Sequence, residues 1–357
     1  MSLPKQPLFP AGVLFAIAAA ALFGASTPLS KLLLGSIEPW LLAGLLYLGS
    51  GLGLSLWLVI QSSVTGKASA EAPLKRADLP WLSGAILSGG VVGPVLLMLG
   101  LVATPAASAS LMLNLEGVCT ALLAWFVFKE NFDRRIALGM ALITAGGVML
   151  SWPGDTEIGV PWGSIWIAGA CLAWGIDNNL TRKVSGGNPV QIAAVKGLVA
   201  GSVNLSLAVL DGSPWPSVPT VLAAGAVGLI GYGVSLACFV MALRHLGTAR
   251  SGAYFSLAPF VGAAFSLLIF QEGFSLLFAA AAVCMGLGVW LHLTEHHIHE
   301  HVHEPMEHEH SHVHDEHHQH EHLPTDPPGE PHTHLHRHTA LRHSHEHYPD
   351  IHHRHGH

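Results

Sequence analysis

The fold is indicated by two matching stretches of sequence, Gly100-Leu-Val-Ala-Thr-Pro-Ala-Ala-Ser-Ala-Ser110 and Ala242-Leu-Arg-His-Leu-Gly-Thr-Ala-Arg-Ser-Gly252. The match continues at the same offset of 142 residues in two later pairs of segments, Leu115-Glu-Gly-Val118 with Leu257-Ala-Pro-Phe260 and Phe128-Lys-Glu-Asn-Phe132 with Phe270-Gln-Glu-Gly-Phe274. An internal repeat marks a structural unit that is used twice. The sequence therefore predicts two halves with the same arrangement of elements.

The composition places both halves in a lipid bilayer. Of the 357 residues, 50% are hydrophobic and only 11% are charged, a balance far from that of a soluble enzyme. Ten runs are long and apolar enough to cross the hydrocarbon core as helices, at 11–34, 38–60, 80–102, 104–128, 135–152, 162–181, 190–210, 219–243, 249–270 and 273–293. We therefore expect an all-α integral membrane protein with ten transmembrane helices.

Five of these spans fall in each repeat, at residues 8–152 and 160–293. An odd number of spans inserts the two halves with opposite polarity, which predicts a binding site between them near the midplane. Basic residues favour the cytoplasmic ends of spans. With the N-terminus inside, the basic residues on the cytoplasmic side are Lys5, Lys67, Lys75, Arg76, Lys129, Arg134, Arg135, Arg182, Lys183, Arg244 and Arg250. Both termini are therefore predicted to be cytoplasmic, in an inner or plasma membrane.

The most telling residues are Trp174-Gly175 near the start of the second half and Ser256-Leu-Ala-Pro259 running on to Glu272. In these motifs the chain resembles the drug/metabolite transporter superfamily, specifically the EamA-type ten-helix permeases. The resemblance covers about residues 12–293. It implies a secondary transporter, usually an exporter, with a central cavity lined by helices of both repeats. The first repeat departs from the pattern, with Glu116-Gly117 where the second has Ala258-Pro259.

Glu116 is the first candidate for transport chemistry, because an ionisable side chain inside a span normally faces a cavity or a partner. On a continuous helix it shares a face with Met112, Cys119 and Thr120, which gives a thioether, a carboxylate, a thiol and a hydroxyl in one column. One interpretation is a path for a transition metal. The other is that Glu116 couples proton movement or forms a salt bridge while Met112 and Cys119 only pack. Asn114, in the same span, is assigned to the same cavity.

The sixth span supplies a second polar group, with Trp174, Asp177, Asn178 and Thr181 in an otherwise apolar helix. These residues either line the cavity or join helices by hydrogen bonds. Lys196, inside the seventh span, is expected to be the counter-charge of Glu116 or Asp177. Tyr254 is added as a residue that would line a pocket for an organic substrate.

Residues 294–357 form a tail of different composition, which holds 24 of the 26 histidines and is predicted to be disordered and cytoplasmic. Imidazole is the commonest metal ligand, so closely spaced histidines favour labile binding of Ni, Co, Zn or Cu. The candidate ligands are His296, His297, His299, His301, His303, His308, His310, His312, His314, His317, His318, His320, His322, His332, His334, His336 and His338. The other interpretations are a pH-responsive polyelectrolyte or a passive tail.

Together these features predict export of divalent transition metal ions, Ni²⁺ or Co²⁺ and also Zn²⁺. Proton exchange is the expected energy source, since the chain has no GxxxxGK[ST] nucleotide-binding motif. The alternative is an exporter of amino acids or other small metabolites whose tail senses or buffers metal; a membrane-anchored metal store is a third hypothesis. We expect no enzymatic activity, no tightly bound cofactor and no nucleic-acid partner, while a homodimer is an assembly that the sequence allows.

Overall fold

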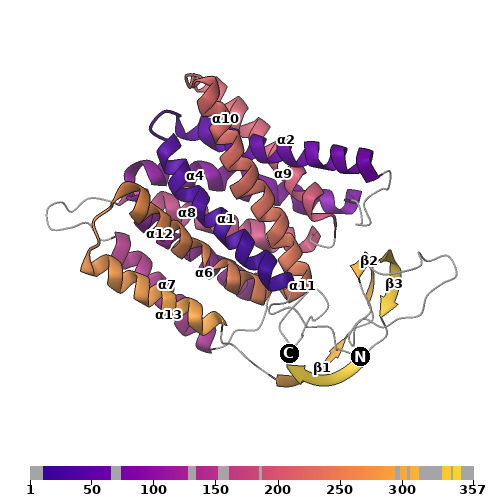
Figure 1. The fold of residues 1–357 in the computed structure, drawn as a ribbon. Coiled ribbons are helices and arrows are strands. Elements are labelled where there is room, and N and C mark those ends of the chain that lie inside the picture. The colour runs from indigo at the N-terminus through magenta and orange to yellow at the C-terminus, as the bar shows by residue number, and fades with distance from the viewer. Residues whose placement is uncertain are drawn as a thin grey trace, which may run out of the picture.

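The first half of the chain folds into a series of helices that pack into one body with those of the second half (Figure 1). The computed structural model describes residues 11–65, 74–127, 134–151, 161–184, 187–293, 298–303, 306–312, 332–338 and 341–346. The helices of the first half are α1 Ala11–Leu33, α2 Pro39–Thr65, η1 Arg76–Asp78, α3 Leu79–Ala85, η2 Ile86–Val92, α4 Gly93–Ala103, α5 Ala106–Met112, α6 Leu115–Phe126 and α7 Arg134–Ser151.

The second half repeats this order. Its helices are α8 Trp162–Thr181, η3 Arg182–Val184, α9 Pro189–Leu210, α10 Val218–Val227, η4 Gly228–Val234, α11 Ser235–Phe255, α12 Ala258–Phe270 and α13 Leu276–Leu293. The antiparallel pairs α2 with α9, α7 with α13, and α1 with α11 make extensive contacts between the two halves. The halves therefore interlock, and the space between them is a shared core.

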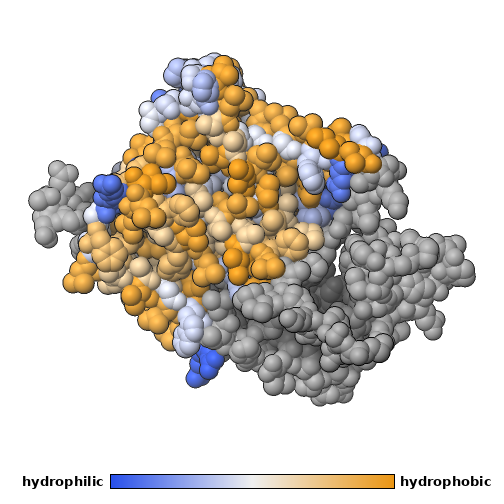
Figure 2. All heavy atoms as spheres, in the orientation of Figure 1, coloured by the Kyte–Doolittle hydropathy of each residue, from blue (hydrophilic) through white to orange (hydrophobic). Residues whose placement is uncertain are grey.

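The surface of the helical body is that of a membrane protein. Six described segments are long and apolar enough to cross a membrane, at Gly12–Leu33, Pro39–Val64, Arg76–Ala103, Ala106–Leu123, Pro189–Leu210 and Val218–Ala242. Shorter apolar helices lie at Ala137–Ser151, Ala258–Phe270 and Leu276–Leu291, and α8 covers the sixth predicted span. Large apolar side chains such as Val64, Leu268 and Leu276 are mostly exposed, and the face drawn in Figure 2 is predominantly apolar. Such a surface requires lipid rather than water around it.

One predicted boundary is wrong. The sequence places a break at 244–248 between the eighth and ninth spans, but α11 runs through these residues as helix and ends at Phe255. In the first repeat the equivalent chain does break, between α4 and α5 at Thr104-Pro105. Proline lacks the N–H that continues a helix, whereas the second repeat has Gly247 at the corresponding position, which keeps its N–H.

The tail also differs from the prediction of a disordered segment. Its described residues form four strands, β1 Ile298–His303, β2 Met306–His312, β3 His332–His338 and β4 Leu341–Glu346. They pair as two antiparallel ladders, β1 with β4 and β2 with β3. Residues that alternate in character along a segment fit the period of a strand, and the tail alternates histidine with other residues.

Two π-helical segments occupy equivalent places in the two repeats. The segments η2 and η4 are offset by 142 residues, the same offset as the matching sequences. A π-helical turn leaves carbonyl groups poorly paired within the helix. In η2 the Gly89 carbonyl accepts hydrogen bonds from the Tyr47 hydroxyl at 2.8 Å and the Trp174 indole at 2.9 Å, and the Gly90 carbonyl accepts one from Asn204 at 3.0 Å. Side chains from three other helices thus hold this irregular turn in place.

Glycines allow α2 and α9 to meet backbone to backbone. A Cβ atom at Gly201 would lie 2.6 Å from the Leu48 Cα, and one at Gly197 would lie 2.7 Å from the Gly51 Cα. Small residues are the usual means of close helix contact in membranes, where burial of apolar surface gives little net attraction. This contact brings the second and seventh spans together beside the central space.

We expect Gly201→Ala to lower the melting temperature of the purified protein, because the added methyl group meets the Leu48 backbone. The cost should be about 1–3 kcal/mol, as for other overpacked contacts. Gly225→Ala in α10 is the matched control, since a Cβ there meets no atom within 4 Å. Equal melting temperatures for the two variants would contradict the proposed backbone contact.

Candidate functional site

A cavity lies between the two repeats and encloses about 620 Å³, a volume that includes the space at its mouth. Small-molecule sites in proteins usually measure about 300–1,000 Å³. The polar side chains on its wall are Ser50, Glu116, Asp177, Asn178, Lys196 and Ser235. The aromatic ones are Phe23, Tyr47, Trp174, Tyr232, Phe239 and Phe255. The cavity is therefore mainly apolar, with a few charged groups at defined places.

The first polar group is a buried ion pair between α8 and α9. The Lys196 ammonium donates to the two carboxylate oxygens of Asp177 at 2.6 and 2.8 Å, and to the Thr181 hydroxyl at 3.1 Å. The Thr181 hydroxyl in turn donates to Asp177 at 2.7 Å. The side chains of Lys196 and Asp177 are only 3% and 10% exposed. Both charges are thus neutralised by each other, away from water.

The second polar group is Glu116, which stands in the first turn of α6. The Asn178 amide donates to one Glu116 oxygen at 2.8 Å and to the Thr120 hydroxyl at 3.3 Å. The chain breaks at Leu113-Asn114 between α5 and α6, so Glu116 stands near a helix N-terminus, where the helix dipole favours negative charge. No cationic side chain lies within salt-bridge distance of Glu116 among the described residues.

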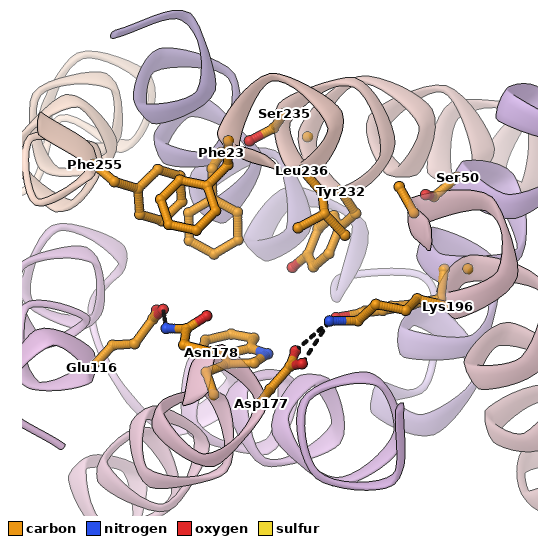
Figure 3. A pocket seen from close by; sticks show the side chains of 16 residues that line it. Phe23, Ser50, Glu116, Asp177, Asn178, Lys196, Tyr232, Ser235, Leu236 and Phe255 are labelled. Atoms are coloured by element: carbon orange, nitrogen blue, oxygen red, sulfur yellow. Dashed lines mark hydrogen bonds and ion pairs between the residues drawn. The ribbon is translucent and has the colours of Figure 1, made fainter. Parts of the chain in front are cut away.

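Aromatic rings cover the opposite wall. Phe23 of α1 lies edge-on to Trp174 and Tyr232, with ring centroids 5.9 and 5.8 Å apart, and its ring lies 5.4 Å from that of Phe255. In Figure 3 Phe23 and Phe255 lie across the cavity from Glu116 and Asn178, while Lys196 and Asp177 lie at the other end. The site has a carboxylate end, an ion-pair end and an aromatic wall.

Five of the residues predicted from sequence line this cavity together: Glu116, Trp174, Asp177, Asn178 and Lys196. Thr181 does not line it but holds the ion pair from behind. The sequence left open which acid is the partner of Lys196, and the structure pairs it with Asp177.

The other four predicted cavity residues are elsewhere. Met112 is buried at the end of α5, Asn114 donates to the Leu111 carbonyl at 3.0 Å, Cys119 packs against Gly175, and Tyr254 is not on the cavity wall. The column of Met112 with Glu116 assumed one continuous helix. Since the chain turns at Leu113-Asn114, the two side chains belong to different helices and do not share a face.

The aromatic wall was not identified from sequence. Phe23 and Tyr232 each adjoin a glycine, and Tyr47 and Phe239 stand in apolar runs like many other aromatic residues. Only the packing of α1, α2, η4 and α11 around one space distinguishes these rings from those that face lipid.

A corner at one end of the bundle is held by two further charged residues. Lys31 of α1 donates to the Leu101 carbonyl and to the Thr104 carbonyl, the latter at 3.1 Å, where α4 ends. Glu272, after α12, accepts hydrogen bonds from the Ala106 and Ala107 N–H groups at 2.7 and 3.0 Å, where α5 begins. Each charge lies at the helix end that its sign stabilises. The acid of the Phe270–Phe274 motif therefore joins the second repeat to the first.

The described side chains, which leave out those of the tail strands, include no group of three or more His, Cys, Asp or Glu that is arranged to hold a metal ion. The predicted tail ligands His296, His297, His314, His317, His318, His320 and His322 lie outside the described residues.

Comparison with known proteins places the whole helical body in one family. The model of the EamA-like transporter family matches residues 10–152 and 161–294. The chain belongs to the EamA-like transporter family. Each matched region contains one complete set of helices, and their interface is the cavity described above.

This EamA-like transporter has relatives of similar length. It is 29% identical to an uncharacterized transporter of Methanothermobacter thermautotrophicus over 296 residues, which is 78% of this chain and 85% of the relative. It is 24% identical to the uncharacterized inner membrane transporter YedA of Escherichia coli K12, over 71% of this chain and 80% of YedA. A crystal structure with 18% identity matches 78% of this chain and 94% of its own with a TM-score of 0.59, which supports the fold alone. This protein is therefore a multi-pass membrane transporter.

We expect Asp177→Asn to destabilise the transporter strongly, because it leaves the Lys196 ammonium buried without its counter-charge. Breaking a buried pair from one side costs about 3–5 kcal/mol, whereas replacing both partners costs much less. The double variant Asp177→Asn/Lys196→Met should therefore melt at a higher temperature than Asp177→Asn. Additive losses in thermal unfolding would show that the pair contributes nothing as a pair.

Proposed function

We propose that this EamA-like transporter carries small organic molecules that bear a protonated amino group, a narrower form of the amino-acid and metabolite alternative. The observation that carries the proposal is the charge of the cavity. Lys196 neutralises Asp177, while Glu116 has a hydrogen bond from Asn178 and no cationic partner among the described residues. The cavity therefore has a formal charge of −1 at Glu116. An ammonium group is the organic partner that this charge favours.

The aromatic wall supports an organic substrate. Phe23 and Phe255 face Glu116 across the cavity, and ring faces attract cations as well as apolar groups. An amine with an apolar or aromatic body would place its ammonium at Glu116 and its body against these rings. Lys196 at the far end is a suitable neighbour for the carboxylate of an amino acid.

Proton exchange is the coupling that this arrangement supports. One carboxylate with no fixed counter-charge binds either a proton or an ammonium group, so the two compete for Glu116. Export of the amine would then alternate with proton entry, in a protein whose two termini lie in the cytoplasm. Alternating access through inverted repeats requires a central site that both repeats build, and Glu116 comes from the first while Asp177 and Lys196 come from the second.

We expect Glu116→Gln to reduce transport of 2-phenylethylamine into proteoliposomes with an imposed pH gradient by at least about tenfold, the equivalent of 1.4 kcal/mol. Glutamine keeps an oxygen for Asn178, so the melting temperature should change little. Glu38→Gln is the matched control, since Glu38 is exposed at the start of α2 and should transport normally.

Phenylacetate serves as the opposite probe, because it keeps the aromatic ring and replaces the amine by a carboxylate. The wild-type protein should carry 2-phenylethylamine and phenylalanine and exclude phenylacetate. Equal transport of phenylacetate, or amine transport that survives Glu116→Gln, would contradict the proposal.

Export of Ni²⁺, Co²⁺ or Zn²⁺ is the second candidate, and the histidine-rich tail is the observation that favours it. A tail that gathers metal beside a transporter with an acidic cavity is a coherent arrangement. The cavity itself argues for the organic substrate, since Glu116 and Asp177 are its only acids, Lys196 occupies Asp177, and neither Met112 nor Cys119 is on its wall. Borderline metal ions prefer nitrogen and sulfur ligands to a single carboxylate.

Cellular metal content separates the two candidates. After challenge with Ni, Co, Zn or Cu, cells that make the full-length protein should contain as much metal as cells that make Glu116→Gln. A protein stopped after Leu293 shows how much metal the tail retains. A lower content of one metal with the full-length protein, lost in Glu116→Gln, would identify metal export and overturn the organic-amine proposal.

A further inference from the structure

The four strands of the tail share one register. Ile298 pairs with Glu346 at the start of the β1–β4 ladder, and Met306 pairs with His338 at the start of the β2–β3 ladder. Eight residues separate the two positions along the first arm, and eight separate their partners along the second. The two ladders therefore continue each other as the arms of one antiparallel hairpin, and no residue is gained or lost between them.

This register places histidine opposite histidine. The facing pairs of the β2–β3 ladder are Met306 with His338, His308 with His336, His310 with His334 and His312 with His332. Because alternate residues of a strand share a face, these positions all belong to the same face of the ladder. Histidine or methionine therefore occupies every position of that face.

The other face of the same ladder is entirely different. Its facing pairs are Glu307 with Arg337, Glu309 with Leu335 and Ser311 with Thr333. A slip of one residue between the arms would set each histidine opposite one of these residues. The coincidence of histidines across the ladder thus depends on the register, and is not a consequence of histidine content alone.

We propose that the β2–β3 ladder is a binding site for a divalent transition metal ion, with the facing pairs His308–His336 and His310–His334 as its ligands. Facing residues of an antiparallel ladder have Cβ atoms about 4.5–5.5 Å apart, and the next pair on the same face follows two residues along. Two such pairs supply four imidazoles from adjacent backbone positions. Imidazole suits Zn²⁺, Ni²⁺, Co²⁺ and Cu²⁺, and four nitrogen donors satisfy the tetrahedral or square-planar geometry of these ions.

The β1–β4 ladder repeats the pattern on a smaller scale. It has two facing histidine pairs, His299 with His345 and His301 with His343, whereas His303 faces Leu341. It therefore supplies a second, shorter set of four histidines in the same hairpin. The proposal concerns the tail alone and does not rest on the function proposed for the cavity.

A ladder differs from a flexible chelator in how its two arms depend on each other. In a flexible tail, the His-x-His spacing of each arm binds metal by itself, so losses from the two arms add. In the ladder, one site needs both arms, so either arm alone is enough to remove it. A cycle of single-arm and double-arm variants measures this dependence.

The test is calorimetric titration of Ni²⁺ into the full-length protein in detergent. The variants are His308→Gln/His310→Gln in β2, His334→Gln/His336→Gln in β3, and all four together. We expect each arm variant to raise the Kd of the tightest site at least about tenfold, and the fourfold variant to raise it no further. Zn²⁺ is titrated in the same way, to show whether the site is general to borderline ions.

His317→Gln/His320→Gln is the matched control, because it removes two histidines with similar spacing that belong to neither ladder. It should leave the tightest Kd unchanged. Additive losses from the two arms, a control that weakens binding as much as the arm variants, or Ni²⁺ binding no tighter than that of a protein stopped after Leu293 would each overturn the proposal.

Discussion

A lipid bilayer offers no hydrogen-bond partner to an exposed peptide group, and this constraint decides where the chain departs from a regular helix. The π-helical segment η2 is tolerated because Tyr47, Trp174 and Asn204 donate to its carbonyls. Tyr47 and Trp174 also line the cavity. The residues that satisfy the irregular backbone are thus partly the residues that shape the site, and irregularity in this protein is concentrated where the two repeats meet.

The repeats place equivalent irregularities around one space but supply different chemistry to it. The π-helical segments η2 and η4 correspond by the repeat offset, whereas Glu116 in the first repeat corresponds to Ala258 in the second. The carboxylate is therefore on one side only, and the ion pair Asp177–Lys196 comes from the other repeat. A symmetric scaffold thus gives an asymmetric pocket, which distinguishes one end of an elongated substrate from the other.

The sequence is sufficient for those features that depend on one helix at a time. Apolar length predicts the spans, and a charge inside a span identifies Glu116, Asp177 and Lys196, because burying a charge in lipid is costly for any residue. The column from Met112 to Cys119 failed because it required an unbroken helix, and nothing in Leu113-Asn114 distinguishes a turn from two more helical residues. The aromatic wall could not be predicted, because its rings come from several helices whose packing no single segment encodes.

The two carboxylates of the cavity show how packing assigns different roles to the same chemical group. Asp177 is fully engaged, since Lys196 and Thr181 occupy its oxygens and a Cβ at Gly89 would meet its side chain. That pair neutralises itself and holds α8 to α9. Glu116 is half-buried, stands at a helix N-terminus and accepts a neutral amide, so its negative charge is supported without being cancelled. A charge that the fold supports but does not neutralise is the group through which an exchangeable cation, proton or ammonium, acts on the transporter.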